Sequence, residues 1–257
     1  RAFETKSGGW LRSKKIDEAI ETVNEIYSNN GFIFARVQPE LQERGEQVAD
    51  LVVNIEEGDP YTVRRIDFEG NTRTKDKVLR RELRVQEGFV MNTGALRNSV
   101  FKVNQLGYFQ LEQEEPVAID VDSENKTVDL VFNGAEADRT ELQFGGGWSE
   151  TFGFEGQFGL RTRNFMGRGE TLSAQLQRGR LRDLIDLSYF VPWFLDRPQT
   201  IGIRVFDLEF DRFFGTAADD DLDDIRQQQR GATLSYGRSL RLFQQASIAY
   251  TRSELED

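Results

Sequence analysis

The sequence contains no cysteine and no histidine among its 257 residues, and it has only five prolines and two methionines. Without cysteine the chain has neither a disulfide framework nor thiol chemistry. Without histidine it lacks the commonest general base and the commonest metal ligand. These absences argue against most hydrolases and metalloenzymes. We therefore expect no catalytic residue, no metal and no other cofactor.

Long apolar runs and excess positive charge are missing too. No stretch approaches the roughly 18 apolar residues of a transmembrane helix, and residues 1–10 lack the apolar segment of a signal peptide. Either the protein is cytoplasmic or this sequence is a mature or truncated piece of a longer protein, and we favour truncation. The net charge of −11 argues against a nucleic-acid partner, because a phosphate-binding domain carries a basic patch. Twenty phenylalanines and 23 glycines favour β structure with close backbone approaches.

The first half of the chain reads as two small α/β modules. In the first, the apolar spacing predicts a helix over 14–31, with Ser13 as its N-cap, and then strands at 32–41 and 48–55. The second begins with a strand at 61–68, where a shift in apolar parity between Val63 and Ile66 predicts either a bulge or an early start of the strand. Helices at 74–83 and 92–106 follow, and then strands at 117–121 and 127–133.

The two modules resemble each other. Ala49–Asn54 matches Val128–Asn133, and Gly31-Phe32 matches Gly107-Tyr108. Such self-similarity indicates tandem copies of one β-α-α-β-β unit. We expect the second copy to be complete over 61–135. The first, over 1–58, lacks its opening strand and most of its first helix.

Small modules without a catalytic constellation usually bind other molecules. A three-stranded sheet has open edges, to which an extended peptide can add as a further strand. One candidate edge is Phe34–Gln38. The other consists of Val117, Ala118, Ile119, Asp120 and Val121.

From Thr140 onward, apolar residues recur at every second position. A soluble sandwich turns such a face inward, whereas a membrane barrel turns it to lipid and its polar face to the lumen. We favour the barrel because the strands are about ten residues long and aromatic residues lie near their ends. The seven segments are Leu142–Trp148, Phe152–Leu160, Leu172–Leu176, Ile185–Val191, Ile201–Val205, Ala232–Tyr236 and Ala246–Tyr250.

The connections between these segments also fit a barrel. Short turns on one side alternate with longer loops on the other, as in outer-membrane proteins. The longest loop, 212–228, contains the acidic run Asp219–Asp221. Its spacing is not that of an EF-hand, so we interpret it as a solvated loop. Seven strands cannot close a single-chain bacterial barrel, and we expect the 139–257 region to continue past Asp257.

Six short motifs are similar to those of the BamA family of outer-membrane β-barrel assembly factors. They occur in the family's order, across the change from modules to strands, and the resemblance covers nearly the whole chain. The motifs are IDFEGN (66–71), VLRREL (78–83), LGYF (106–109), GGGWS (145–149), RNFMGRG (163–169) and YFVPWF (189–194).

The resemblance implies that the modules are periplasmic POTRA domains and that Arg139 or Thr140 begins the first barrel strand. In the family this strand pairs weakly with the last one, and strands of incoming outer-membrane proteins are thought to add there. Three consecutive glycines weaken a strand interior, which suits a seam that opens. They equally suit relief of crowding or a kink. The expected gate residues are Leu142, Gln143, Phe144, Gly145, Gly146, Gly147 and Trp148.

A dense group of charges surrounds the first helix of the second module. Such a group is ordinarily solvated surface, but the resemblance implies that it docks an accessory lipoprotein of the assembly complex. Its members are Arg80, Arg81, Glu82, Arg84 and Glu87.

The sequence thus predicts α+β POTRA modules followed by antiparallel transmembrane β-barrel strands of an incomplete barrel. We expect a non-enzymatic outer-membrane factor that folds and inserts outer-membrane proteins. Its expected partners are unfolded clients, accessory lipoproteins and outer-membrane lipid. One alternative is a related POTRA-barrel transporter for autotransporter assembly or for secretion of a single passenger. A barrel hydrolase has little support, because no G-x-S-x-G motif is present.

Overall fold

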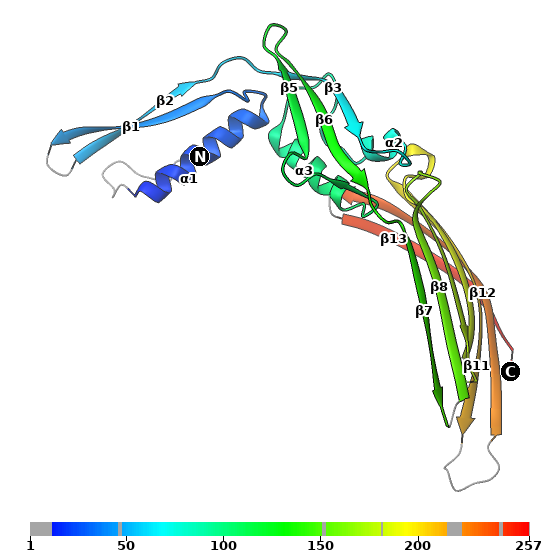
Figure 1. The fold of residues 1–257 in the computed structure, drawn as a ribbon. Helices are drawn as coiled ribbons and strands as arrows, with labels where there is room; N and C mark the ends of the chain where they lie inside the picture. The colour runs from blue at the N-terminus through cyan, green and yellow to red at the C-terminus, as the bar shows by residue number, and fades with distance from the viewer. Residues whose placement is uncertain are drawn as a thin grey trace. The chain divides into compact units, whose positions relative to one another are not determined.

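The computed structural model describes residues 12–45, 48–150, 153–180, 182–214, 223–241 and 244–256 (Figure 1); side chains are described for these except 211–214, 223–226 and 241. Phe152 and the acidic run Asp219–Asp221 lie outside the described residues. The chain forms two compact units. The first comprises residues 1–72 and 79–136, and the second comprises 73–78 and 137–257.

The first module consists of a helix and a hairpin. They are α1 (Ser13–Asn29), β1 (Arg36–Gly45) and β2 (Val48–Glu56), and β1 pairs antiparallel with β2. The predicted helix is confirmed, but Arg12 is its N-cap instead of Ser13 and makes no side-chain capping bond. The strand expected from residue 32 begins only at Arg36, because residues 32–35 form a turn closed by the Ala35 N–H and the Phe32 carbonyl.

The second module has two helices and one sheet. β6 is the central strand and pairs parallel with β3 and antiparallel with β5 and β4. The elements are β3 (Thr62–Glu69), α2 (Asp76–Arg80), α3 (Thr93–Asn104), β4 (Phe109–Leu111), β5 (Val117–Asp122) and β6 (Thr127–Glu136).

The local predictions for this module are largely confirmed. The β3–β6 register shifts between Val63 and Arg65, which is the predicted bulge. Asn92 caps α3 by accepting a hydrogen bond from the Ala95 N–H. The first helix is shorter than expected, at five residues, and β4 was not expected. The core contains Ile66, Leu79, Val103, Phe109, Val128, Leu130 and Phe132, each at most 2% exposed.

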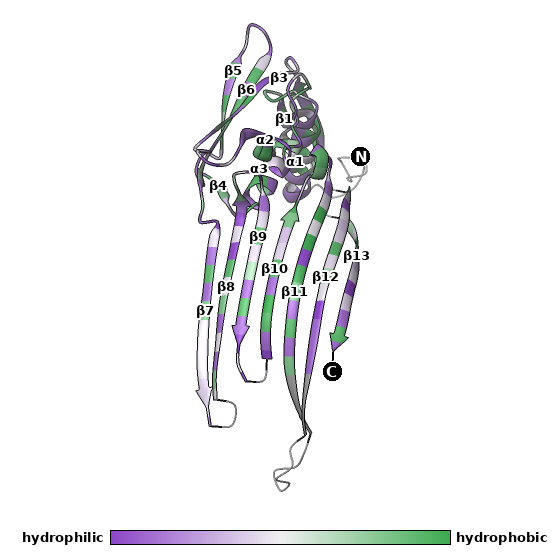
Figure 2. Ribbon diagram, turned by 90° about the vertical axis from the view of Figure 1, so that its right-hand side faces the viewer, coloured by the Kyte–Doolittle hydropathy of each residue, from purple (hydrophilic) through white to green (hydrophobic). Residues whose placement is uncertain are grey.

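The second unit carries a seven-stranded antiparallel sheet in which each strand pairs with its sequence neighbours, as in the meander of Figure 2. All seven predicted strands are present, and β7 and β13 are the two ends of the sheet. A short helical turn, η1 (Phe194–Asp196), links β10 to β11. The strands are β7 (Thr140–Ser149), β8 (Gly153–Phe165), β9 (Glu170–Arg178), β10 (Arg182–Val191), β11 (Gln199–Phe214), β12 (Asp223–Arg241) and β13 (Gln244–Glu256).

The register of these strands sorts their side chains onto two faces, and Figure 2 shows the resulting alternation along each strand. Apolar side chains on one face align from strand to strand, and most of them are exposed. We call this the apolar face: Leu142, Phe144, Phe158, Leu160, Ala174, Leu176, Ile185, Leu187, Ile203, Val205, Leu234, Tyr236, Ile248 and Tyr250. The opposite, polar face includes Gln143, Glu155, Gln157, Gln175, Gln177, Asp186, Arg204, Thr233 and Thr251. It also carries apolar side chains, namely Phe190, which was expected there, and Leu184, Phe206 and Leu208.

Candidate functional sites at two strand edges

β7 ends the sheet and, among the described residues, pairs only with β8. The Arg163 N–H donates to the Arg139 carbonyl across 2.6 Å, so this pair is hydrogen-bonded. Hydrogen-bonded and non-hydrogen-bonded pairs alternate along an antiparallel ladder. The N–H and C=O groups of Leu142, Phe144 and Gly146 therefore point away from β8, toward the open edge.

The three glycines of β7 have different surroundings. A Cβ atom at position 145 would lie 3.1 Å from Nε2 of Gln157, and one at position 146 would lie 3.1 Å from the Glu155 carbonyl oxygen. At position 147 a Cβ would have no neighbour within 4 Å. Gly145 and Gly146 thus relieve crowding against β8, as one sequence interpretation held, whereas Gly147 does not. The seam role of the three glycines stays a prediction.

A buried asparagine organises the turn between β8 and β9. Asn164 is fully buried; its Oδ1 accepts from the Gly169 N–H at 2.7 Å, and its Nδ2 donates to the Thr74 hydroxyl at 2.6 Å. The Lys75 N–H donates to the Gly167 carbonyl. A Cβ at Gly167 would lie 2.1 Å from the Arg73 carbonyl oxygen. These contacts place residues 73–78 in the second unit and explain why the RNFMGRG motif is rich in glycine.

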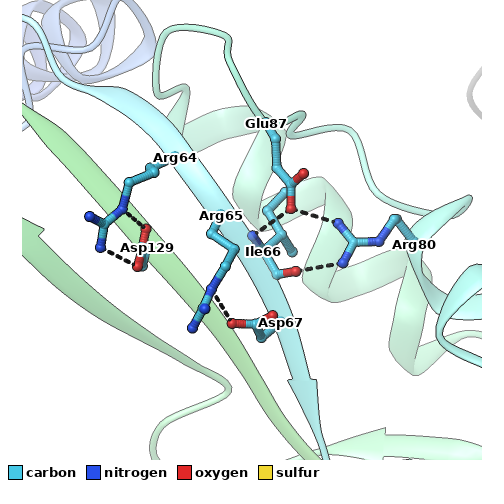
Figure 3. A network of polar contacts seen from close by, with 7 residues as sticks. All are labelled: Arg64, Arg65, Ile66, Asp67, Arg80, Glu87 and Asp129. Carbon is cyan, nitrogen blue, oxygen red and sulfur yellow. Dashed lines mark hydrogen bonds and ion pairs between the residues drawn. The ribbon is translucent and has the colours of Figure 1, made fainter.

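The outer edge of β3 in the second module is closed. Val63 exchanges hydrogen bonds with the 88–89 segment, and the Met91 N–H donates to the Tyr61 carbonyl. Farther along, the Ile66 N–H donates to Oε1 of Glu87 at 2.8 Å, and Arg80 donates to the Ile66 carbonyl at 2.6 Å (Figure 3). Backbone and side chains together therefore occupy the positions where another strand would pair.

The other edge of this sheet is open in the described part of the chain, because β5 pairs only with β6. The Asn133 N–H donates to the Pro116 carbonyl, which fixes the phase of the ladder. Val117, Ile119 and Val121 then direct their N–H and C=O groups outward. The structure thus places the predicted Val117–Val121 edge at a free side of the sheet. The other candidate edge, Phe34–Gln38, belongs only partly to a strand, because its first two residues precede β1.

The predicted docking residues divide into supporting and exposed groups. Arg80 and Glu87 form an ion pair of 2.9 Å across the closed edge of β3. The hydrogen bond from the Ile66 N–H, followed by that from Arg80, holds the pKa of the Glu87 carboxyl below its usual value. The side chains of Arg81 and Glu82 are only 15% and 18% exposed. Of these five residues, only Arg84 is exposed and takes no part in closing that edge.

Sequence reasoning missed two polar features of the first unit. The two modules are joined by Asn29, whose Oδ1 accepts from the Gly94 N–H and whose carbonyl accepts from the Asn92 side chain. At the β3 bulge, Arg64 donates two hydrogen bonds to the Asp129 carboxylate, at 2.6 and 2.8 Å. These hydrogen bonds hold the pKa of Asp129 below its usual value. From the sequence, the Asn-Gly motif at 30–31 indicated only the end of the first helix and not the contact between the two modules.

Within the described residues, no helix is long and apolar enough to cross a membrane. In the part of the chain that the structure describes, no three or more acidic residues are grouped so that they could hold a metal ion.

Comparison with known protein families identifies both halves of the chain. The family model POTRA, described as surface antigen variable number repeat, matches residues 1–58 and 61–136. The Omp85 superfamily domain matches residues 164–256.

Individual relatives agree with this assignment. The outer membrane protein assembly factor BamA of Neisseria meningitidis serogroup B is 27% identical over 80% of this chain, which spans only 26% of that relative. A crystal structure of Haemophilus ducreyi BamA lacking POTRA domains 1–3 matches 99% of this chain and 47% of that one, with a TM-score of 0.75 and 23% identity. CdiB from Acinetobacter baumannii shares the fold at a TM-score of 0.53 and 14% identity, over 96% of this chain and 47% of that one. The chain therefore belongs to the family of POTRA-bearing Omp85 proteins that includes the outer membrane assembly factor BamA.

Proposed function

We propose that this chain is part of a non-enzymatic assembly factor that folds and inserts outer-membrane proteins by offering them a strand edge. The observation that carries the proposal is β7, whose outward N–H and C=O groups lie at the end of a sheet with an exposed apolar face. A strand edge in lipid needs a pairing partner, so a client strand that offers one can pair with β7. The sheet lies in the bacterial outer membrane, and the modules lie in the periplasm.

A proline substitution tests the template role directly. Phe144→Pro removes an N–H that points to the open edge and leaves the β7–β8 bonds in place, since proline is tolerated on an edge of this kind. Phe144→Ala removes the same side chain but keeps the N–H. In liposomes containing the complete encoded protein, we expect the proline variant to insert a client barrel much more slowly than the alanine variant. Equal rates would contradict templating at β7.

The β5 edge supports a second, periplasmic binding step. Its outward groups at Val117, Ile119 and Val121 suit addition of an extended, unfolded client segment. The matched test compares Ile119→Pro, which loses the outward N–H, with Ile119→Ala, which keeps it. The measurement is cross-linking of an unfolded client to the module, and we expect less of it in the proline variant. If both variants cross-link equally, main-chain pairing at β5 is not the binding mode.

We propose that accessory lipoproteins dock at the charged group on the second module, with Arg84 as the residue best placed to test it. Reversing Glu87 would also release the Ile66 N–H and alter the β3 edge, so its effect on docking would be ambiguous. Arg84→Glu changes an exposed charge only. We expect it to reduce co-purification of lipoproteins with the tagged protein; unchanged recovery would argue for ordinary solvated surface.

The transporter alternative expected from the sequence has weaker support, because the curated relative that matches most of this chain is named an outer membrane protein assembly factor. The assembly role and the transporter role predict different cargo. An assembly factor inserts many unrelated barrels, whereas a dedicated transporter passes a single passenger. Insertion of two unrelated client barrels by the same preparation would favour assembly.

A further inference from the structure

A small hollow of about 270 Å³ lies on the polar face of the sheet, beside the glycines of β7. The backbone of Gly145–Gly147 forms one side of it. Side chains with hydrogen-bond acceptors form the remainder: the carboxylate of Glu155 and the amides of Gln157 and Gln177. Among the described residues, the Glu155 side chain makes no hydrogen bond or ion pair, and its charge faces the hollow.

The neighbouring positions show how this part of the sheet fills the space above a glycine. Gln157 lies over its cross-strand partner Gly145, with Nε2 3.1 Å from where a Cβ would be. Gln143 lies over its partner Gly159 in the same way, with Oε1 3.5 Å from where a Cβ would be. In both pairs a long polar side chain from one strand covers a glycine on the next. Gly147 differs, because its partner Glu155 leaves it uncovered.

A strand added to the open edge of β7 would reach Gly147 from the other side. Gly147 is hydrogen-bonded toward β8, so toward an antiparallel newcomer it occupies a non-hydrogen-bonded position. In such pairs the Cα atoms are about 4.5 Å apart and the side chains are closest. The residue of the newcomer that pairs with Gly147 therefore projects onto the polar face, beside the hollow.

We propose that this hollow is a recognition site for a cationic side chain, lysine or arginine, of the client strand that pairs with β7. The cation lies over Gly147, as Gln157 lies over Gly145, and its N–H groups donate to Glu155 and to the amide oxygens of Gln157 and Gln177. The site rests on the proposed strand templating and adds a side-chain preference to main-chain pairing. The site thereby determines which residue of the client strand pairs with Gly147, and so it sets the register of that strand on β7.

The register is established first. These 257 residues contain no cysteine. With any cysteine elsewhere in the complete encoded protein replaced by serine, Gly147→Cys introduces a single thiol. Client barrels with one cysteine at successive positions of the pairing strand are then oxidised during insertion in liposomes. We expect a disulfide at one position only. Absence of a disulfide at every position, together with insertion that Phe144→Pro does not slow, overturns templating itself.

The charge preference is tested at the position so identified. Four clients carry lysine, glutamine, leucine or glutamate at that position. The rate at which each client inserts is measured with the unchanged protein, with Glu155→Gln and with Glu155→Lys. With Glu155 we expect the lysine client to insert about threefold faster than the glutamate client, the size typical of a partly exposed ion pair. Glu155→Gln abolishes the difference and Glu155→Lys reverses it.

Two controls keep the result interpretable. Gln175→Lys adds the same charge to the polar face two strands from β7 and leaves the order of clients unchanged. Gly147→Val fills the hollow without changing its charge and removes the advantage of lysine. If the lysine client keeps its advantage in Glu155→Lys, or if no client differs from another in any variant, the site is overturned while templating stands.

Discussion

The second module and the seven-stranded sheet use the same alternation of apolar residues in opposite ways. In the module, Val128, Leu130 and Phe132 of β6 are completely buried. In the sheet, Phe144 is 85% exposed and Ile248 is 72% exposed, although both belong to equally regular strands. A period of two therefore specifies a strand with two unlike faces, but it does not specify what covers the apolar one.

The difference lies in what the rest of the chain provides. In the module, α3 buries Leu96 and Val103, and the sheet contributes the other side of that core. In the sheet of β7–β13, Leu184 is the only large apolar side chain counted as buried among the described residues. Its apolar face, lacking a layer of helices, requires lipid.

Removing a large core side chain should destabilise the module far more than the sheet. Phe132→Ala leaves a cavity beneath β6, and we expect it to lower the free energy of unfolding of the module by about 3–5 kcal/mol. Phe144→Ala removes the same atoms from an exposed position and should cost much less. Urea unfolding of the protein in liposomes, with local probes in each region, measures both. Similar losses at the two sites would break the contrast.

A charge should be costly on the apolar face and tolerated on the polar face. Leu187→Arg places a guanidinium where lipid is expected, which costs about 2–4 kcal/mol near the membrane midplane. Gln175→Arg places it on the polar face of the neighbouring strand, opposite Asp186. We expect only the first to lower the yield of folded, heat-modifiable protein. If both variants fold equally well, the apolar face does not contact lipid.

The second unit should depend on one buried polar group at a turn. Asn164→Ala removes the partners of the Gly169 N–H and the Thr74 hydroxyl, so we expect a loss of about 1–3 kcal/mol in the stability of this turn. Met166→Ala, in the same turn but 65% exposed, is the control. Proteolysis at the turn reports the loss. Equal cleavage of the two variants would contradict the role of Asn164.

The closed edge of β3 should loosen in acid. The folded-state pKa of Glu87 is lowered, so its contribution is present above its unfolded pKa, near 4.5, and is lost as pH falls through the folded pKa. We expect Glu87→Ala to reduce the protection of the Ile66 amide against hydrogen exchange at pH 7. Below the folded pKa, wild type and variant should converge. A constant difference across this range would show that the carboxylate is not responsible.

Much of the fold could be predicted because it depends on local chemistry. The β3 bulge follows from the parity of Val63 and Ile66, and α3 follows from the apolar spacing of residues 92–106. The faces of the seven strands follow from alternation alone. The shortness of α2 and the three residues of β4 could not be predicted in this way, because tertiary packing decides them.

The sequence predicted which segments form the candidate sites, but not which of their residues contact each other. The glycines of β7 stand out in the sequence, whereas the pairing of Gln157 with Gly145 depends on register, which spacing does not reveal. Likewise, the charges at Arg80 and Glu87 suggested a surface for partners. Both side chains instead hydrogen-bond the backbone of Ile66 in β3, and so they close the edge of that strand. Spacing does not reveal these bonds, because Ile66 is distant from both residues in sequence.

The asymmetry between the closed edge of β3 and the open edge of β5 also limits how copies of this module can associate. A sheet open on both sides can join others head to tail and grow into a fibre. With one side occupied by residues 87–91 and by Arg80, copies of this sheet that pair edge to edge do so, among the described residues, on the side of β5 and β4, which produces a closed pair. The module can therefore remain receptive to unfolded strands without becoming a seed for its own polymerisation.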